Sequence, residues 1–504
     1  MPNSHSRQSS KQRIAILGAG FSGLAMAHEC LKHGFEVAIY DKESYAGGKC
    51  IGTEKDGIVH ELTHRQFFAK NKNLIDFLKE IPSSKGSCFD SLYPQEKVQF
   101  HWGKPVKTMQ FQRAYFNVIE KLLDDAKSAY AMFYADVPLK DILWFKKRLT
   151  SEENHSKLLD TPVSEYFEYQ FRTQLGAFLK PVLLGWIGAT DNTPALSVLD
   201  LLNNKTGELH PDAPGAYSLG IREPISDAII TPLIKYLESQ GVSFHFNCEV
   251  DYLNLNTTNS LIDKVHLTCG QSIEADLFVS ALPAHVTHNL LGEHCTDLDY
   301  DYIFSHGFQF HFSAMPEELD NKTVGIVIDS VWGLSYSVTR RQAAHSERIC
   351  LSITATNLSC TGGNQNQLPL IDCNKSQIRD ELLIQIFGNT KLLNSVYYES
   401  FHPGPGAELV DPEELNTKYS SWFKGDVLRN ENGEPKHWVF QHALTQPRAK
   451  SRQPLTSSKC NNLFFVGEYL FDPKQSWRVP VTLERCVETV RLCAETIVKR
   501  AAIA

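Results

Sequence analysis

The sequence predicts an α/β fold that combines a parallel sheet, a mixed α+β domain and a helical insertion. Three observations support this prediction. A short apolar strand, a glycine-rich loop and a helix follow one another near the N-terminus. Aromatic-rich segments with helical periodicity fill residues 70–205. Residues 302–356 alternate apolar and polar side chains, which is typical of antiparallel strands with one covered face.

The composition is that of a globular protein with a large core. The 504 residues are 42% hydrophobic and 21% charged, with a formal net charge of −8. These values exclude disorder, collagen-like repeats and coiled coil as the main architecture, and a mildly acidic chain without a basic tract disfavours nucleic acid. The sequence contains no run of 18 apolar residues, so no helix is expected to cross a membrane. Its twelve cysteines form no CxxC pair, which favours reduced thiols and a cytoplasmic location.

The first elements form a β-α-β unit. Residues 13–18 are an apolar, β-branched run that ends in glycine, as in a buried parallel strand. Residues 22–33 follow with helical spacing, Gly34 ends that helix, and a second strand is predicted at 36–41. A crossover between parallel strands of this kind is expected to be right-handed.

The later elements divide the chain into a discontinuous dinucleotide-binding domain, a helical insertion and a second domain. A helix at 224–240 precedes strands at 242–250 and 275–283, and a strand at 462–469 precedes the closing helix at 482–500. The predicted ranges are 1–80, 210–290 and 455–504 for the first domain, 81–209 for the insertion, and 291–454 for the second, substrate-binding domain.

The loop from Gly18 to Gly23 has the pattern G-x-G-x-x-G between a strand and a helix. Gly18 makes the tight turn, Gly20 lets the backbone approach a pyrophosphate, and Gly23 lets helix and strand pack closely. The helix start, at Phe21 and Ser22, offers free N–H groups to phosphate. Together these features predict a Rossmann-type dinucleotide site.

Asp41 ends the second strand, where a carboxylate accepts hydrogen bonds from ribose hydroxyls. The same carboxylate would repel a 2′-phosphate, which argues against NADP. Its neighbour Lys42 is added to the predicted cofactor contacts.

Two further motifs indicate which dinucleotide binds. Ala46-Gly47-Gly48-Lys49 follows Asp41, and Phe464-Phe465-Val466-Gly467-Glu468 precedes the closing helix. In these motifs the chain resembles the FAD-dependent superfamily of amine oxidases, protoporphyrinogen oxidase and phytoene desaturases. The resemblance implies FAD, with Gly48 and Lys49 at its phosphates. It also implies that the backbone of Val250 meets the adenine, and that Gly467 and Glu468 reach the ribityl chain.

Within that superfamily the chain is most similar to the carotenoid and phytoene desaturases. Glu61 and the pair Phe67-Phe68 match the segment that follows the second glycine motif in desaturases, but Arg65 stands where those enzymes have histidine. The closing helix also departs from the pattern, with Arg485 in a glycine position and Val490 further along. A longer loop before this helix carries Trp477.

The resemblance implies a chemistry in which FAD accepts a hydride at N5 from a substrate carbon, while the protein positions that carbon and excludes water. The candidate catalytic residues are Arg65, His306 and Trp477, with Arg65 the first choice. Further pocket candidates are Trp438 and His442. The histidines lack the HExxH spacing, so no metal site is predicted.

The predicted function is an FAD-dependent dehydrogenase, desaturase or oxidase that acts on a mostly apolar small molecule such as a specialised metabolite, an amine or a polyene. The strand from Ser305 to Phe310 lacks the lysine found in amine oxidases, which disfavours a simple amine oxidase. The substrate, the electron acceptor and the oligomeric state stay open.

Two alternatives remain. The helix around Trp144 and Phe145, next to three basic residues, suits either a peripheral membrane contact or a buried helix with a basic edge. The whole chain could also be a non-catalytic binding protein similar to the GDP-dissociation inhibitors, which share the fold without the cofactor. Arg485 and Val490 favour that alternative, whereas the intact glycine loop and Asp41 oppose it.

Overall fold

A computed structural model provides the structure of the protein. It describes residues 11–501 except 56, 96, 104–105, 113–117, 152, 203–208, 214–217, 257, 292–299, 321–322, 343–346, 359, 361–366, 406, 410–437, 441–442, 450–453 and 471–481.

The N-terminal β-α-β unit is confirmed. Strand β1 (Arg13–Leu17), helix α1 (Phe21–Lys32) and strand β2 (Glu36–Tyr40) follow one another, and the two strands pair in parallel. Side chains of β1 alternate between the two faces of the sheet and are buried on both, which explains why the run Ile14–Leu17 is wholly apolar.

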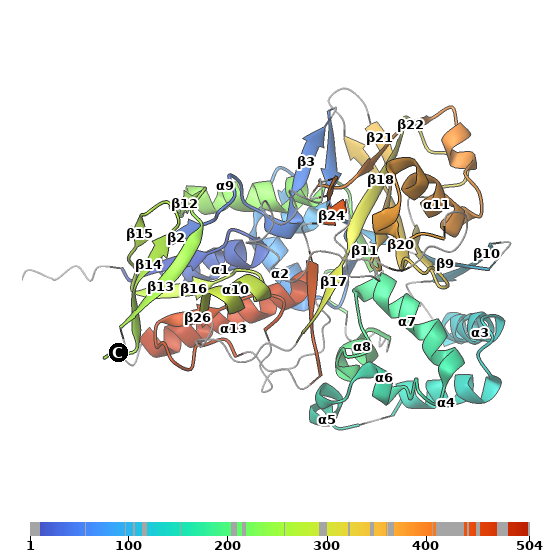
Figure 1. The fold of residues 1–504 in the computed structure, drawn as a ribbon, viewed down its shortest axis with the longest axis horizontal. Coiled ribbons are helices and arrows are strands. Elements are labelled where there is room, and N and C mark those ends of the chain that lie inside the picture. The colour runs from blue at the N-terminus through green and yellow to red at the C-terminus, as the bar shows by residue number, and fades with distance from the viewer. Residues whose placement is uncertain are drawn as a thin grey trace, which may run out of the picture.

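The parallel sheet has five strands in the order β12-β2-β1-β16-β26. The added strands come from distant parts of the chain: β12 (Ser243–His245), β16 (Leu277–Ser280) and β26 (Leu463–Phe465). One face is covered by α1 and the helices α2 (Lys72–Glu80), α9 (Thr231–Ser239) and α13 (Leu483–Ala501) (Figure 1). The other face is covered by α10 (Ala284–Leu291) and a small sheet of β13 (Val250–Asn256), β14 (Leu261–Leu267) and β15 (Ser272–Ile273).

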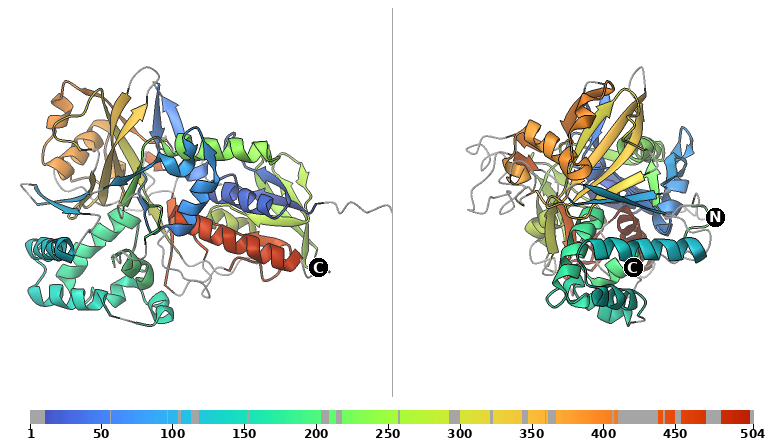
Figure 2. Two further views of the ribbon diagram at one scale, coloured as in Figure 1. Left: turned by 180° about the vertical axis from the view of Figure 1, so that it is seen from behind. Right: turned by 90° about the vertical axis from the view of Figure 1, so that its right-hand side faces the viewer.

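A second sheet has seven strands in the order β10-β9-β19-β20-β21-β18-β22. Their bounds are Lys107–Gln112, Lys97–Trp102, Thr323–Val327, Leu334–Gln342, Glu347–Ala355, His306–Phe312 and Tyr398–Pro403, in that order. All neighbours pair antiparallel except β9 and β19, which are parallel. Helix α11 (Lys375–Phe387) packs on one face (Figure 2).

The prediction that these strands have one covered face is wrong for β18. All seven of its residues are buried. The reason is that its second face lies against the segment after the second glycine motif, where Gly307 N–H donates to the Leu62 carbonyl (2.6 Å) and Gln309 donates to the Glu61 carbonyl (2.9 Å).

The predicted insertion at 81–209 begins with strands rather than helices. Besides β9 and β10, it contains β6 (Pro82–Ser83), β7 (Gly86–Ser87) and β8 (Leu92–Gln95). Its helices are α3 (Val118–Tyr134), α4 (Leu139–Leu149), α5 (His155–Asp160), α6 (Val163–Tyr166), α7 (Thr173–Ile187) and α8 (Ala195–Leu202). They gather below the seven-stranded sheet in Figure 1, apart from the parallel sheet.

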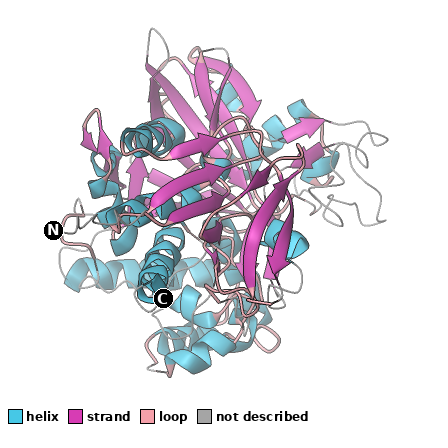
Figure 3. Cartoon of the chain, turned by 90° about the vertical axis from the view of Figure 1, so that its left-hand side faces the viewer, coloured by secondary structure: helices cyan, strands magenta, loops and turns pink. Residues whose placement is uncertain are grey.

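Short elements connect these units (Figure 3). The strands are β3 (Gly52–Lys55), β4 (Ile58–Glu61), β5 (Phe67–Phe68), β11 (Ser218–Ile221), β17 (Tyr300–Phe304), β23 (Ala407–Leu409), β24 (Trp438–Phe440) and β25 (Ala443–Pro447). Single-turn helices lie at Gly48–Cys50, Cys88–Ser91, Ser226–Ile230, Leu370–Asp372 and Lys391–Asn394. Among the helices that the structure describes, none has both the length and the hydropathy of a membrane span.

Candidate cofactor and substrate site

The glycine loop leaves an open space in front of the N-terminus of α1. Gly18 has a φ of +105°, in the region that favours glycine. A Cβ atom on Gly23 would lie 1.9 Å from the Gly18 carbonyl oxygen, so the fold requires glycine there. A Cβ atom on Gly20 would meet no atom within 4 Å, although its φ of −68° suits any residue. Gly20 therefore preserves space outside the protein core, at a helix end that attracts phosphate.

The residues that follow Gly20 contribute backbone rather than side chains. Phe21 and Ser22 begin α1 and are buried. No acidic residue occupies the first turn of α1, so the positive end of the helix dipole is not neutralised there.

The second glycine motif lies directly against the first. Gly47 N–H donates to the Ala19 carbonyl (2.9 Å), and Gly47 forms a parallel bridge with Gly20. Gly47 and Gly48 both have positive φ values, and a Cβ atom on Gly48 would lie 3.1 Å from the Cα of Gly20. The sequence predicted both loops as cofactor contacts, and the fold brings them together.

Lys49 and Glu468 join the two ends of the chain. Their side chains form an ion pair across 419 positions of sequence. Glu468 follows β26 and Gly467, whose carbonyl accepts a hydrogen bond from the Thr489 hydroxyl of α13 (3.3 Å). The Lys49 side chain is 27% exposed and that of Glu468 is 17% exposed, so this ion pair is partly buried but accessible to an anionic ligand.

Asp41 lies at the carboxyl end of β2, next to the glycine loop. Its carboxylate accepts hydrogen bonds from the N–H groups of Ala19 (2.6 Å) and Glu43 (2.9 Å), while burial raises the pKa of Asp41. A carboxylate has about four acceptor positions, so both oxygens can still accept ribose hydroxyls. Burial also lowers the pKa of the neighbouring Lys42 to about 8.

The segment predicted to meet an adenine lies beside Asp41. Cys248 N–H donates to the Asp41 carbonyl (2.8 Å), and Val250 begins β13 two residues later. The predicted contacts from three separate parts of the chain are therefore arranged around the carboxyl edge of the parallel sheet.

The first turn of α13 has an unusual buried charge. Arg485 is 2% exposed, and burial lowers the pKa of its guanidinium to about 10, while the charges of Glu488 and Glu468 act in the opposite direction. Burial raises the pKa of Glu488 to about 7. Val490, by contrast, packs in the apolar core between α13 and α1.

A cavity of about 150 Å³ lies between the seven-stranded sheet, α7 and the start of α13. Three parts of the molecule line it: the segment after the second glycine motif, the carboxyl end of α7 with Trp186, and the start of α13. Strand residues complete the wall. The full lining is Thr63–Phe68, Asn71, Leu74, Gly185–Gly188, Ser305, Val324, Ile326, Ser335, Thr354, Thr356, Thr482 and Leu483.

Arg65 lines this cavity next to the second glycine motif. Its Nη2 donates to the Lys49 carbonyl, whereas its buried Nε has no hydrogen-bond partner among the residues that the structure describes. The Nδ1 of the neighbouring His64 forms a hydrogen bond with the Thr354 hydroxyl (2.8 Å). Burial and the charge of Arg65 lower the pKa of His64 to about 4, so this ring is neutral at pH 7.

Gln66 is held at both ends of its amide. Its Nε2 donates to Ser218 (2.5 Å), and its Oε1 accepts from the Trp186 indole (3.1 Å). Trp186, His64 and Gln66 were not predicted as site residues. The latter two flank Arg65 in sequence, which was the available signal, whereas nothing local distinguishes Trp186.

Among the other candidate residues, His306 is described and does not line this cavity. His306 is buried in β18, its Nε2 donates to the Gly404 carbonyl (3.1 Å), and its neighbour Ser305 lines the cavity instead. Trp477 and His442 lie outside the described residues. Trp438 begins β24, which pairs with β23.

A larger cavity of about 580 Å³ shares α7 as a wall. Leu183 and Leu184 line it, together with residues such as Tyr169, Asp191 and Val331. Its lining contains no residue of the segment after the second glycine motif or of α13, whereas Arg65 in the smaller cavity donates to the Lys49 carbonyl.

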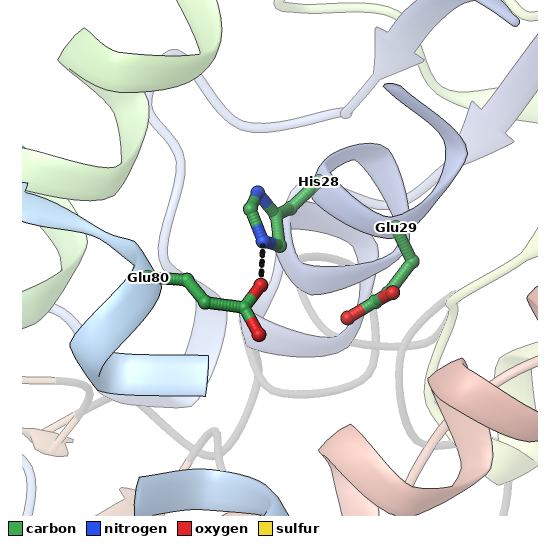
Figure 4. Close-up of side chains that lie close together, drawn as sticks. All are labelled: His28, Glu29 and Glu80. Carbon is green, nitrogen blue, oxygen red and sulfur yellow. Dashed lines mark hydrogen bonds and ion pairs between the residues drawn. The ribbon is translucent and has the colours of Figure 1, made fainter. Parts of the chain in front are cut away.

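His28, Glu29 and Glu80 form the one described cluster whose ligand atoms are close enough for a metal ion. His28 Nε2 contacts Glu80 (2.7 Å), and the Glu29 carboxylate approaches the same group from the next position on α1 (Figure 4). Lys32 and Arg491 both pair with these carboxylates. The two cations supply the positive charge, so the cluster fastens α1, α2 and α13 together.

An FAD fits the described residues at its ADP end. The space outside Gly20 at the helix N-terminus matches a pyrophosphate. The carboxylate of Asp41 matches the hydroxyls of a ribose. The cavity beside Arg65 lies at the opposite end of this arrangement, past Lys49.

The chain is similar to several known proteins. Residues 16–81 match the family described as NAD(P)-binding Rossmann-like domain. Mitochondrial protoporphyrinogen oxidase of Nicotiana tabacum is 26% identical over 36% of this chain and 34% of its own length. A probable zeta-carotene desaturase of Synechococcus elongatus is 24% identical over 56% and 60%. The matches thus span between one third and three fifths of these relatives.

The fold is similar over nearly the whole chain to that of a putrescine oxidase bound to putrescine. The TM-score is 0.60 with 12% identity, over 97% of this chain and 99% of that one. The chain is thus similar to oxidases and desaturases in part of its sequence, and to an amine oxidase in its fold. Its N-terminal domain is Rossmann-like within a mixed α/β fold.

Proposed function

We propose that the protein is an FAD-dependent oxidoreductase that removes a hydride from a small molecule. The observation that carries this proposal is the convergence of Gly20, Asp41, Gly48 and Glu468 on one edge of the parallel sheet, beside a cavity. Bound FAD would supply the chemistry by accepting the hydride at N5.

The residues at the glycine loops would hold the ADP half. Backbone N–H groups of Phe21, Ser22 and Gly23 at the helix start would donate to the pyrophosphate, and Asp41 would accept the ribose hydroxyls. Lys49 would exchange part of its pairing with Glu468 for a phosphate, which would free Glu468 for the ribityl hydroxyls.

Lys42, Val250 and Gly18 would complete the cofactor site. Val250 would contact the adenine through its backbone, next to Lys42, and Gly18 and Gly467 would keep the two strand ends close to the ligand.

Among the catalytic candidates, Arg65 is the residue that the cavity supports. It borders the cavity that would contain the substrate, and its Nε is available for a further hydrogen bond in the described part of the chain. We retain His306 as a positioning residue for β18 and Trp477 as a candidate only.

The binding-protein alternative is not favoured. The relatives named above are oxidases and desaturases, and the space outside Gly20 is maintained although the fold itself does not require glycine there. A protein that had given up its dinucleotide would have no reason to keep this space open.

We also propose that the protein is cytoplasmic and contacts a membrane surface through the helical insertion. Trp144 and Phe145, the residues expected to contact the membrane, are not exposed. Phe145 is buried, and the Arg172 guanidinium covers Trp144 at 3.9 Å from its ring centre. The large apolar side chains exposed on this unit are instead Tyr130, Phe133, Tyr134, Leu139, Leu143 and Phe171.

The oxidoreductase proposal is tested by the colour of the purified protein. We expect the flavin absorption bands in the folded protein and release of FAD on denaturation. Anaerobic mixing with a panel of amino acids, amines and polyenes should then bleach these bands with one class. Folded protein that stays colourless with excess FAD would contradict the proposal.

A further inference from the structure

Arg65 brings a positive charge to the 150 Å³ cavity without a counter-charge. In the part of the chain that the structure describes, no carboxylate pairs with Arg65, and its Nη2 donates to the neutral Lys49 carbonyl. Other arginines in low-exposure positions differ, since Arg341 pairs with Glu61 and Arg172 pairs with Asp141. A partly desolvated guanidinium costs free energy unless an anion accompanies it.

The described residues that line the rest of the cavity carry no negative charge. No aspartate or glutamate occurs among its lining residues, and His64 is neutral at pH 7. Gln66 uses both ends of its amide within the protein, and the Lys49 ammonium pairs with Glu468. The hydroxyls of residues such as Thr63, Thr354 and Thr482 are neutral donors. The field inside the cavity is therefore positive, which disfavours an ammonium group and favours an anion.

The volume limits the part of a ligand that enters. Pockets for drug-sized ligands have about 300–1,000 Å³, and this cavity has about 150 Å³. It can take a small molecule or one end of a longer one.

We propose that the substrate carries a carboxylate and that Arg65 binds this group inside the cavity. This inference rests on the proposed function, because it names the substrate class of the same site. The guanidinium would donate to the carboxylate through Nε, while Nη2 stays bonded to the Lys49 carbonyl and fixes the orientation of the side chain. Binding of the carboxylate would thereby fix the position of the adjacent carbon relative to the end of the cavity that faces the cofactor.

The test compares benzoate with benzamide, two probes of nearly equal shape that differ in charge. Binding to the FAD-loaded protein is followed by perturbation of the flavin absorption bands and by calorimetry. Three variants are compared with the natural chain: Arg65→Met removes the charge, Arg65→Lys keeps the charge without the planar fork, and Arg340→Met removes an exposed arginine of β20 as the control.

We expect benzoate to bind at least about tenfold more tightly than benzamide. Arg65→Met should abolish this preference, Arg65→Lys should retain part of it, and Arg340→Met should leave it unchanged. Equal binding of the two probes, or a preference that survives in Arg65→Met, would overturn the proposal.

Two further outcomes separate this inference from the proposed function. Loss of FAD together with the preference in Arg65→Met would assign the guanidinium to the flavin and overturn the carboxylate proposal. If the natural chain binds no FAD, the proposed function fails, and calorimetry of benzoate against benzamide on that same protein still decides whether Arg65 binds a carboxylate.

Discussion

Gly20 and Gly23 occupy the same loop but serve different purposes, and substitutions separate them. Gly20→Val adds a side chain into open space at an ordinary φ, so we expect a folded protein with FAD affinity lowered at least about tenfold. Gly23→Ala places a methyl group 1.9 Å from the Gly18 carbonyl oxygen, so we expect loss of stability. Thermal unfolding of the FAD-free proteins and flavin titration measure the two effects.

The comparison is informative because each variant is the control for the other. Unfolding of Gly20→Val would show that the open space is part of the core. Undiminished FAD binding by folded Gly20→Val would place the pyrophosphate elsewhere.

His101 makes stability depend on pH. Burial lowers its pKa to about 4, and its Nε2 contacts the Tyr336 hydroxyl (2.8 Å). The unfolded chain binds a proton near pH 6.5 and the folded chain only near pH 4, so this contribution to stability is lost as pH falls through that window. His101→Gln keeps a hydrogen-bonding side chain but cannot titrate.

We therefore compare the free energy of unfolding of His101→Gln and the natural chain by urea titration from pH 7 to pH 4. Below pH 6.5, the free energy of unfolding of the variant should rise relative to that of the natural chain by up to about 1.4 kcal/mol for each pH unit. Buried carboxyls such as Glu488, whose raised pKa changes stability in the opposite direction, contribute equally to both proteins. Their contribution therefore cancels in the difference between the variant and the natural chain. Parallel curves for the two proteins would refute the assignment. His33→Gln, on the surface, is the matched control.

At the scale of elements, one buried ion pair fastens β4 to the seven-stranded sheet. Glu61 pairs with Arg341 of β20 and also accepts a hydrogen bond from Ile225 N–H (2.7 Å). Both side chains are at most 3% exposed. Because removal of one partner leaves the other charge buried, Glu61→Gln or Arg341→Met should each lower the free energy of unfolding by about 3–5 kcal/mol.

The double variant should lose less than the sum of the single variants, since no unpaired charge remains. Denaturant unfolding measures all three. The control is the exposed ion pair of Arg340, which precedes Arg341 on β20, with Glu347 of β21. Arg340→Met should lower the free energy of unfolding by about 1 kcal/mol or less. Additive losses in the double variant would show that Glu61 and Arg341 are not energetically coupled.

The elements that sequence reasoning predicted well have local signals. The run of β1, the glycine turn into α1 and the apolar strand β26 before α13 each carry their own pattern, and all four form within a few residues of the prediction. Strands β9 and β10 were missed although they pair with each other and lie close together in sequence. Their place in the seven-stranded sheet depends on the pairing of β9 with β19, more than two hundred positions away, which leaves no local pattern.

At the scale of the whole molecule, the same distinction applies to the site. The cofactor contacts are motif residues, so Gly20, Gly48, Asp41 and Glu468 were nameable in advance, and the fold brings their segments together. The cavity wall combines residues from the segment after the second glycine motif, the insertion, the seven-stranded sheet and α13. Residues such as Trp186 became recognisable only once three-dimensional packing was known.

The helical insertion presents the largest group of exposed apolar side chains in the described chain. Phe133 and Leu143 are each 61% exposed and Phe171 is 81% exposed, while exposed Lys140 and Lys147 lie on the same helix as Leu143. Apolar side chains with adjacent lysines suit an anionic lipid surface, where buried apolar area and attraction to negative headgroups add together.

Cosedimentation with lipid vesicles tests this surface. The natural chain should bind vesicles that contain phosphatidylserine more tightly than pure phosphatidylcholine vesicles, because each lysine near the surface contributes about 1 kcal/mol. Phe133→Ser with Leu143→Ser should weaken binding at least about tenfold, since each apolar side chain contributes about 1.5–3 kcal/mol on burial. Val396→Ser with Tyr397→Ser changes an exposed apolar pair far from these helices and should have no effect. Equal binding by the two double variants, or no binding to either vesicle, would remove the membrane contact from the proposed function and leave the oxidoreductase proposal unchanged.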